Sequence, residues 1–141
     1  MLIGEYKHNI DAKGRIIMPM KLRAGVGEHF VATKGLDGCV FVFSVKEWEK
    51  FEEKLRTLPI SNKNARDFTR FFLSGAFEYD IDKQGRFILS ETLKEFAKLD
   101  KEIVIVGMDS RVEIWDKDIW NKKVESISAD DIAEKMEFLG I

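Results

Sequence analysis

Two short stretches with both apolar and polar residues flank an Asp-x-x-Gly turn near the start of the chain. The stretches are residues 5–10 and 15–18, and Asp11 and Gly14 bracket the turn between them. Glycine tolerates positive φ, and an aspartate can accept hydrogen bonds from its own backbone, so the segment between the stretches is suited to a tight turn. We therefore predict two strands joined as a hairpin, followed at Pro19 by a short helix over residues 20–23.

A second pair of apolar stretches, residues 30–33 and 39–43, flanks another turn at residues 35–38. Ser44 and Glu47 then form a capping box, a pattern that begins a helix. Behind it, apolar residues recur at the spacing of one helix face until Pro59, at Val45, Trp48, Phe51, Leu55 and Leu58. A further helix is predicted over residues 62–73.

The whole pattern occurs twice along the chain. Displacing the sequence by 71 residues brings residues 10–17 onto residues 81–88, and a displacement of 72 brings Trp48 onto Trp120. In the second copy Ser90 and Asp116 take the capping positions, and Ser128 caps a terminal helix over residues 128–138. Matched turns, core positions and tryptophans in one order indicate a tandem duplication. We predict repeats at residues 4–48 and 75–120, a helical connector at 49–74 and a helical tail at 121–141.

Composition narrows the class of protein. The chain has 141 residues, of which 45% are hydrophobic and 34% charged, as in an ordinary globular protein. Its single cysteine, Cys39, excludes an internal disulfide and a cysteine-rich zinc site. No apolar run approaches the ~18 residues that span a bilayer, and the first residues lack the apolar centre of a signal peptide. We expect a cytoplasmic protein without a membrane partner.

Motifs of the common enzyme classes are missing. The sequence has no Gly-x-Ser-x-Gly, no phosphate-binding loop ending in Gly-Lys-Ser/Thr and no His-Glu-x-x-His. The two Asp-x-x-Gly turns lack the further oxygen ligands that a calcium loop needs. We expect no catalytic residue, metal, cofactor or small-molecule substrate. A non-enzymatic scaffold or protein-binding module stands as the alternative to a nucleic-acid-binding protein.

The segment from Ile10 to Pro19 reads Ile-Asp-x-x-Gly-Arg, then apolar residues and proline. It resembles the hallmark of AbrB-like, swapped-hairpin DNA-binding modules. Two copies, each with Asp-x-x-x-Arg and each followed by long helices, make the chain similar to the MraZ family from Gly4 to about Trp120. The second copy departs from the pattern because Ser90 replaces the proline, but serine also begins helices well.

The resemblance implies an α+β, mainly β fold in which two tandem swapped-hairpin repeats form a β-barrel core with flanking helices. It also implies ring-like homo-oligomers that bind double-stranded promoter DNA at repeated elements and repress the bacterial division and cell-wall gene cluster. We accordingly expect a nucleoid-associated transcriptional regulator, with the number of subunits left open.

The two repeats differ in charge. Residues 1–25 carry a net charge of +3, whereas residues 76–100 carry −2. Because neutralising phosphates drives DNA affinity, the first repeat is the expected DNA-binding one, although both turns could take part. Arg15 could bond a guanine or simply pair with Asp11 across the turn, and Arg86 poses the same alternative. The candidate DNA-binding residues are Lys7, His8, Lys13, Arg15, Lys21, Arg23, Lys83 and Arg86, with Asp11, Gly14, Asp82 and Gly85 as turn residues.

Most aromatic residues are expected to be structural. Trp48, Trp115 and Trp120 are interpreted as core or interface anchors. Residues 68–72 place phenylalanines on more than one helix face, which favours a subunit contact. Cys39 is expected to be an inert core thiol, and His8 could contact phosphate, although the sequence favours a surface histidine in a strand.

Overall fold

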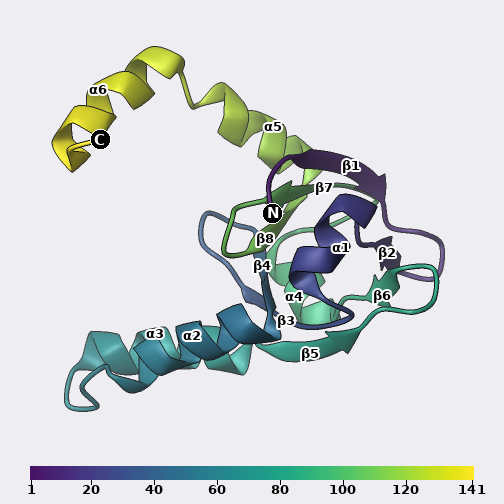
Figure 1. The fold of residues 1–141 in the computed structure, drawn as a ribbon, viewed down its shortest axis with the longest axis horizontal. Coiled ribbons are helices and arrows are strands. Elements are labelled where there is room, and N and C mark those ends of the chain that lie inside the picture. The colour runs from purple at the N-terminus through teal and green to yellow at the C-terminus, as the bar shows by residue number, and fades with distance from the viewer.

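The computed structural model describes residues 1–141 as eight strands and six helices in a mixed α/β arrangement (Figure 1). Six strands form one antiparallel sheet in the order β1-β7-β8-β4-β3-β5, and β2 pairs with β6 in a separate ribbon. The elements are β1 (Glu5–Asn9), β2 (Arg15–Ile17), α1 (Met20–Val26), β3 (His29–Lys34), β4 (Val40–Ser44), α2 (Val45–Arg56), α3 (Lys63–Ser74), β5 (Phe77–Asp80), β6 (Arg86–Ile88), α4 (Glu91–Phe96), β7 (Glu102–Gly107), β8 (Val112–Asp116), α5 (Lys117–Glu125) and α6 (Ala129–Leu139).

The strands around the first turn do not pair with each other as a hairpin. β1 pairs with β7, and β2 pairs with β6, so both strands of the predicted hairpin find their partners in the second repeat. β5 in turn pairs with β3 of the first repeat. The predicted turn and its flanking strands are present, but the pairing is between repeats. No pairing joins β1 to β5 at the two edges of the six-stranded sheet, so a closed barrel stays a prediction.

Two apolar cores lie on the two faces of the six-stranded sheet. The larger one is closed by the β2–β6 ribbon, where Ile16 lies opposite Phe87, and by α1 and α4 through Leu22 and Leu93. The other lies beneath α2, α3 and α5 and contains Trp48 and Trp115. The repeats thus share both cores, and neither forms a core of its own.

The predicted tryptophan and cysteine roles are confirmed. Trp48 and Trp115 are buried, and the half-buried Trp120 packs on Trp115 with ring centroids 5.3 Å apart. Cys39 is buried, and desolvation raises the pKa of its thiol to about 12, which leaves it unreactive.

The predicted helix caps are also confirmed. The side chains of Ser44, Ser90, Asp116 and Ser128 each accept a hydrogen bond from the backbone N–H three residues later. The first short helix runs to Val26 instead of Arg23, and Pro19 is its capping residue. None of the helices is long and apolar enough to cross a membrane.

The phenylalanine-rich helix α3 is better buried than its sequence suggests. Phe72 packs edge-on against Phe51 of α2, and Phe71 packs against Phe96 of α4. Phe68 is the ring that stays largely exposed, at 54%. Most of the phenylalanines that favoured a subunit contact are therefore packed against other residues of the same chain.

Candidate nucleic-acid interface

The two Asp-x-x-Gly turns come from different repeats and lie at the two ends of the short β2–β6 ribbon. Each turn leads directly into one strand of the β2–β6 ribbon, where Arg15 lies opposite Ile88 and Arg86 lies opposite Ile17. Gly14 and Gly85 take positive φ angles of 80° and 78°, which glycine adopts without strain. Figure 1 shows both loops at the same side of the molecule, beyond β2 and β6.

Each turn is organised by its aspartate. Asp11 Oδ1 accepts hydrogen bonds from the backbone N–H groups of Lys13 and Arg15, at 2.9 and 2.8 Å. Asp82 Oδ1 does the same for Gln84 and Arg86, both at 2.9 Å. The pKa of each carboxyl is held below its ordinary 3.8, first by the backbone hydrogen bond from the arginine. The aspartates are therefore structural anchors of the turns.

Both arginines pair with the aspartate of their own turn, as one of the two alternatives predicts. Arg15 Nε lies 2.6 Å from Asp11 Oδ2, and Arg86 Nε lies 2.9 Å from Asp82 Oδ2. Arg15 uses only Nε, so both of its terminal nitrogens have no partner in the chain. Arg86 also donates from Nη2 to Gln84. Because the pair occupies one edge of the guanidinium, it orients the arginine and leaves donors available.

Each repeat also places a cation on the other repeat's turn. Arg23 of α1 donates from Nε to the carbonyl of Met18 at 2.8 Å and from Nη2 to the carbonyl of Gln84 at 3.3 Å. Its guanidinium occupies the space that a Cβ on Gly85 would need. In the opposite direction, Lys94 Nζ lies 3.1 Å from where a Cβ on Gly14 would stand.

This exchange removes the charge contrast calculated along the sequence. The first turn has Lys13, Arg15 and, from the second repeat, Lys94; the second has Lys83, Arg86 and, from the first repeat, Arg23. We call these six residues the two-turn face. Lys94 was not among the predicted site residues, yet a displacement of 71 residues brings Arg23 onto it. That match was the signal that could have found it.

The remaining predicted residues are not gathered at the turns. Residues directly opposite in an antiparallel pair point to the same sheet face. Lys7 lies opposite Val104, which belongs to the core under α5, so Lys7 points away from the ribbon side. His8 lies opposite Ile103 of the other core and points to the ribbon side. Lys21 is exposed on α1.

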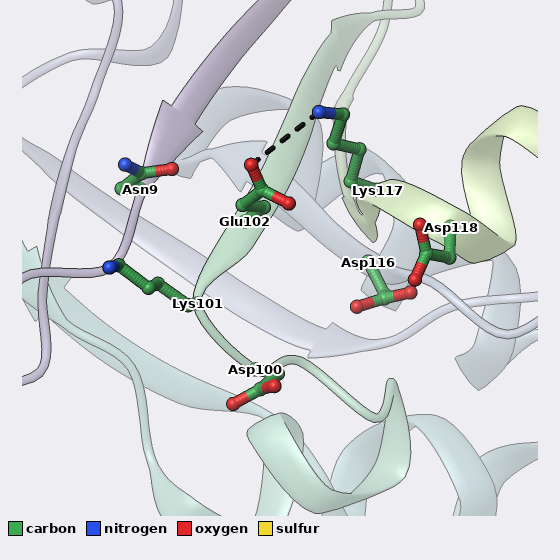
Figure 2. Close-up of a pocket in the computed structure, with 7 residues that line it drawn as sticks. All are labelled: Asn9, Asp100, Lys101, Glu102, Asp116, Lys117 and Asp118. Atoms are coloured by element: carbon green, nitrogen blue, oxygen red, sulfur yellow. Dashed lines mark hydrogen bonds and ion pairs between the residues drawn. The ribbon is translucent and has the colours of Figure 1, made fainter.

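A polar hollow of about 240 Å³ lies at the end of β1 (Figure 2). Its seven lining residues include four carboxylates, but Asp116 caps α5 and Glu102 lies 3.5 Å from Lys117 Nζ. Figure 2 shows the carboxylates spread around the hollow instead of converging on one point. No group of three or more potential ligands is placed to hold a metal ion anywhere in the chain.

Comparison with known proteins agrees with this duplicated architecture. The family model of the MraZ protein, described as antitoxin-like, matches residues 1–71 and again residues 72–138. The chain belongs to the MraZ family. Proteins named transcriptional regulator MraZ are 56% identical in Clostridium beijerinckii, 53% in Caldicellulosiruptor bescii and 51% in Acetivibrio thermocellus, each alignment covering the whole of both chains. By these names MraZ proteins are regulators of transcription and not enzymes.

Proposed function

We propose that this protein is a transcriptional regulator that binds double-stranded promoter DNA through both turns of the two-turn face. The observation that carries the proposal is the arrangement of two Asp-x-x-Gly-Arg turns at the two ends of one short ribbon, each with three cations and with both arginines on the ribbon face opposite the buried Ile16–Phe87 pair. Arginine can donate two hydrogen bonds to one guanine in the major groove, and lysines next to it can neutralise phosphates. The names of the MraZ relatives support regulation of transcription.

The β2–β6 ribbon suits entry into a DNA groove. A two-stranded ribbon fits the width of the major groove, and its outward side chains then face the base edges. On this ribbon Ile16 and Phe87 point into the core, while Ile17 and Ile88 are exposed. The neighbouring arginines are held by their aspartates and are therefore ordered before DNA arrives. Ordering in advance lowers the entropy lost on binding.

Several copies acting together would supply selectivity that one copy lacks. One two-turn face makes few base contacts, so a single subunit should bind weakly. In a homo-oligomeric ring, each contact after the first becomes effectively intramolecular, which raises avidity when the DNA elements are correctly spaced. We propose such a ring, acting at short direct repeats as a repressor of the division and cell-wall gene cluster and associated with the nucleoid. A closed barrel of swapped-hairpin repeats is part of the same proposal.

A gel shift with the DNA upstream of the protein's own gene tests the proposal. The expected result is a shift that survives excess unrelated DNA and disappears with excess specific DNA. The double variant Arg15→Ala/Arg86→Ala should lose the shift while keeping its thermal midpoint, because exposed ion pairs contribute little to stability. A scaffold or protein-binding module would give no sequence-selective shift, and that result would overturn the proposal.

A further inference from the structure

The terminal helix α6 has no partner in its own chain. Ser128 caps its start and Gly140 ends it, yet none of its residues is buried. Figure 1 shows it standing clear of both sheets and of the other helices. Ile132, Met136 and Leu139 recur at helical spacing, so they form one apolar strip, and they are 42%, 37% and 75% exposed. An uncovered apolar strip of this kind on a helix is typical of a surface that binds a partner.

Comparison of the two repeats explains why α6 does not pack on α5. In the first repeat, α3 packs on α2 through Phe72 and Phe51, whose ring centroids lie 5.0 Å apart. In the second repeat, Lys123 of α5 stands at the position matching Phe51. Because a lysine stands where the first repeat has the aromatic ring of this contact, α5 offers no equivalent apolar surface on which α6 could pack.

A groove of matching chemistry lies between the end of α2 and the start of α3. It encloses about 380 Å³, and its apolar wall comes from Leu55, Leu58, Pro59, Ile60 and Ala65. Three arginines line it, Arg56, Arg66 and Arg70, and no carboxylate does, although Arg56 pairs with Glu53 and Arg70 with Asp67 next to it. We call it the α2–α3 groove.

The charge of α6 complements this groove. The helix carries four carboxylates, from Asp130, Asp131, Glu134 and Glu137, against the single cation of Lys135. In Figure 1 the α2–α3 hairpin leaves the lower part of the body and the α5–α6 arm the upper part, both toward the same side, and α6 lies apart from the hairpin that bears the groove. The groove of a second copy could receive α6 instead.

We propose that α6 of one copy docks its apolar strip into the α2–α3 groove of the next copy. The contact joins two different surfaces, so each copy offers one helix and one groove to its neighbours. Heterologous contacts of this kind continue from copy to copy, and they close into a ring when the rotation between neighbours returns to the first copy. The inference deepens the proposed function and rests on the homo-oligomer within it.

A second groove is the strongest alternative docking site for α6. It lies beside α2, over Phe43 and Phe51, and three lysines line it: Lys46, Lys50 and Lys54. Three glutamates line it as well, Glu47, Glu49 and Glu53, so its net charge is balanced. An acidic helix gains less there than in a groove whose charged lining residues are all arginines.

Two surface variants separate these possibilities. In the helix variant Met136→Lys/Leu139→Lys, the apolar strip of α6 is broken; in the groove variant Arg56→Glu/Arg70→Glu, the charge of the groove is reversed. The control Lys46→Glu/Lys50→Glu makes the same change of charge on the other side of α2. Native mass spectrometry should find an assembly larger than a dimer for the unaltered chain and the control, and monomers for both variants. Circular dichroism should show unchanged helix content.

Mixing the two variants tests the direction of the contact. The helix variant keeps a working groove and the groove variant keeps a working α6, so one productive contact can form between them and no ring can. The mixture should give a one-to-one dimer with twice the 16.3 kDa mass of one chain. A mixture that stays monomeric, variants that assemble fully, or a control that dissociates would each overturn the proposal.

The same measurements distinguish this inference from the proposed function. If the unaltered chain assembles and both variants assemble with it, the α6 contact is wrong and the proposed ring stands. If the unaltered chain is a monomer at micromolar concentration, the ring and the contact fail together. The gel shift reports separately on DNA binding by the two-turn face.

Discussion

The guanidinium of Arg23 occupies the space beside Gly85 that any larger residue at that position would need. Arg23 belongs to the first repeat and Gly85 to the turn of the second, so this packing locks the repeats together at the proposed DNA-binding surface. The contact makes Gly85 necessary for two reasons: its φ of +78° and its close approach to a side chain.

Substituting Gly85 therefore should cost more than backbone strain alone. We expect Gly85→Ala to lower the free energy of unfolding by about 1–2 kcal/mol for the left-handed backbone, and further for displacement of Arg23. Gly38 has a φ of +90° and open space around it, so Gly38→Ala isolates the backbone cost. Urea denaturation of both variants measures the difference. Equal losses would mean that the Arg23 contact contributes nothing.

The exchange of cations between repeats predicts that both turns matter for DNA binding. Arg15→Ala and Arg86→Ala should each weaken promoter binding about tenfold or more, because a bidentate arginine–guanine pair is worth about 1–3 kcal/mol. Lys7→Ala should have little effect, since Lys7 lies on the opposite sheet face. Fluorescence anisotropy with promoter DNA measures all three. If only Arg15→Ala weakened binding, the charge contrast along the sequence would be the better guide.

His29 gives the sheet edge a dependence on pH. Its Nδ1 lies 2.7 Å from Asp80 Oδ1 and its Nε2 lies 3.2 Å from Glu78 Oε1, both on β5. The hydrogen bond to Asp80, followed by that to Glu78, raises the pKa of His29 above its ordinary 6.5. A raised pKa stabilises the fold fully below pH 6.5, and this stabilisation is lost as pH rises through the folded-state value.

We therefore expect the thermal midpoint of the unaltered protein to fall relative to that of His29→Gln as the pH rises above 6.5. Scanning calorimetry between about pH 6 and 9 measures the difference between the two proteins, which cancels every contribution that they share. A difference that stays constant with pH would show that the two carboxylates do not hold the protonated imidazole.

A ring of subunits also predicts the form of the operator. Neighbours in a ring are related by rotation, so the DNA should contain direct repeats roughly one helical turn, or ~10 base pairs, apart. Inserting ~5 base pairs between elements rotates one by half a turn and should reduce affinity sharply, whereas ~10 should restore it in part. Affinity that ignores the insertion would show that each subunit binds independently.

Local structure could be predicted from the sequence because local chemistry decides it. Asp11 and Gly14 specify their turn, and Ser44 and Asp116 specify the starts of their helices. Strand partners could not be predicted in the same way. A turn between two strand-like stretches shows that they are neighbours along the chain but not which strand lies beside each of them, so β1 was expected to pair with β2 and instead pairs with β7.

The candidate site shows the same limit. The sequence alone could group the basic residues of each turn, because they are neighbours along the chain. Lys94 reaches the first turn only because the repeats exchange strands. Net charge along the sequence assigned Arg23 and Lys7 to one basic patch, but Arg23 lies on the second turn and Lys7 on the opposite sheet face. Charge patterns along a chain become surfaces only once the strand pairing is known.

Photo-crosslinking to promoter DNA tests the central claim most directly, because it locates the protein surface that contacts DNA. A photoreactive group would be attached in turn at positions 13 and 83, at the tips of the two turns, and at position 7 on the opposite sheet face. We predict crosslinks from both turn positions to the promoter and none from position 7. Crosslinking from position 7 with none from either turn would contradict DNA binding by the two-turn face.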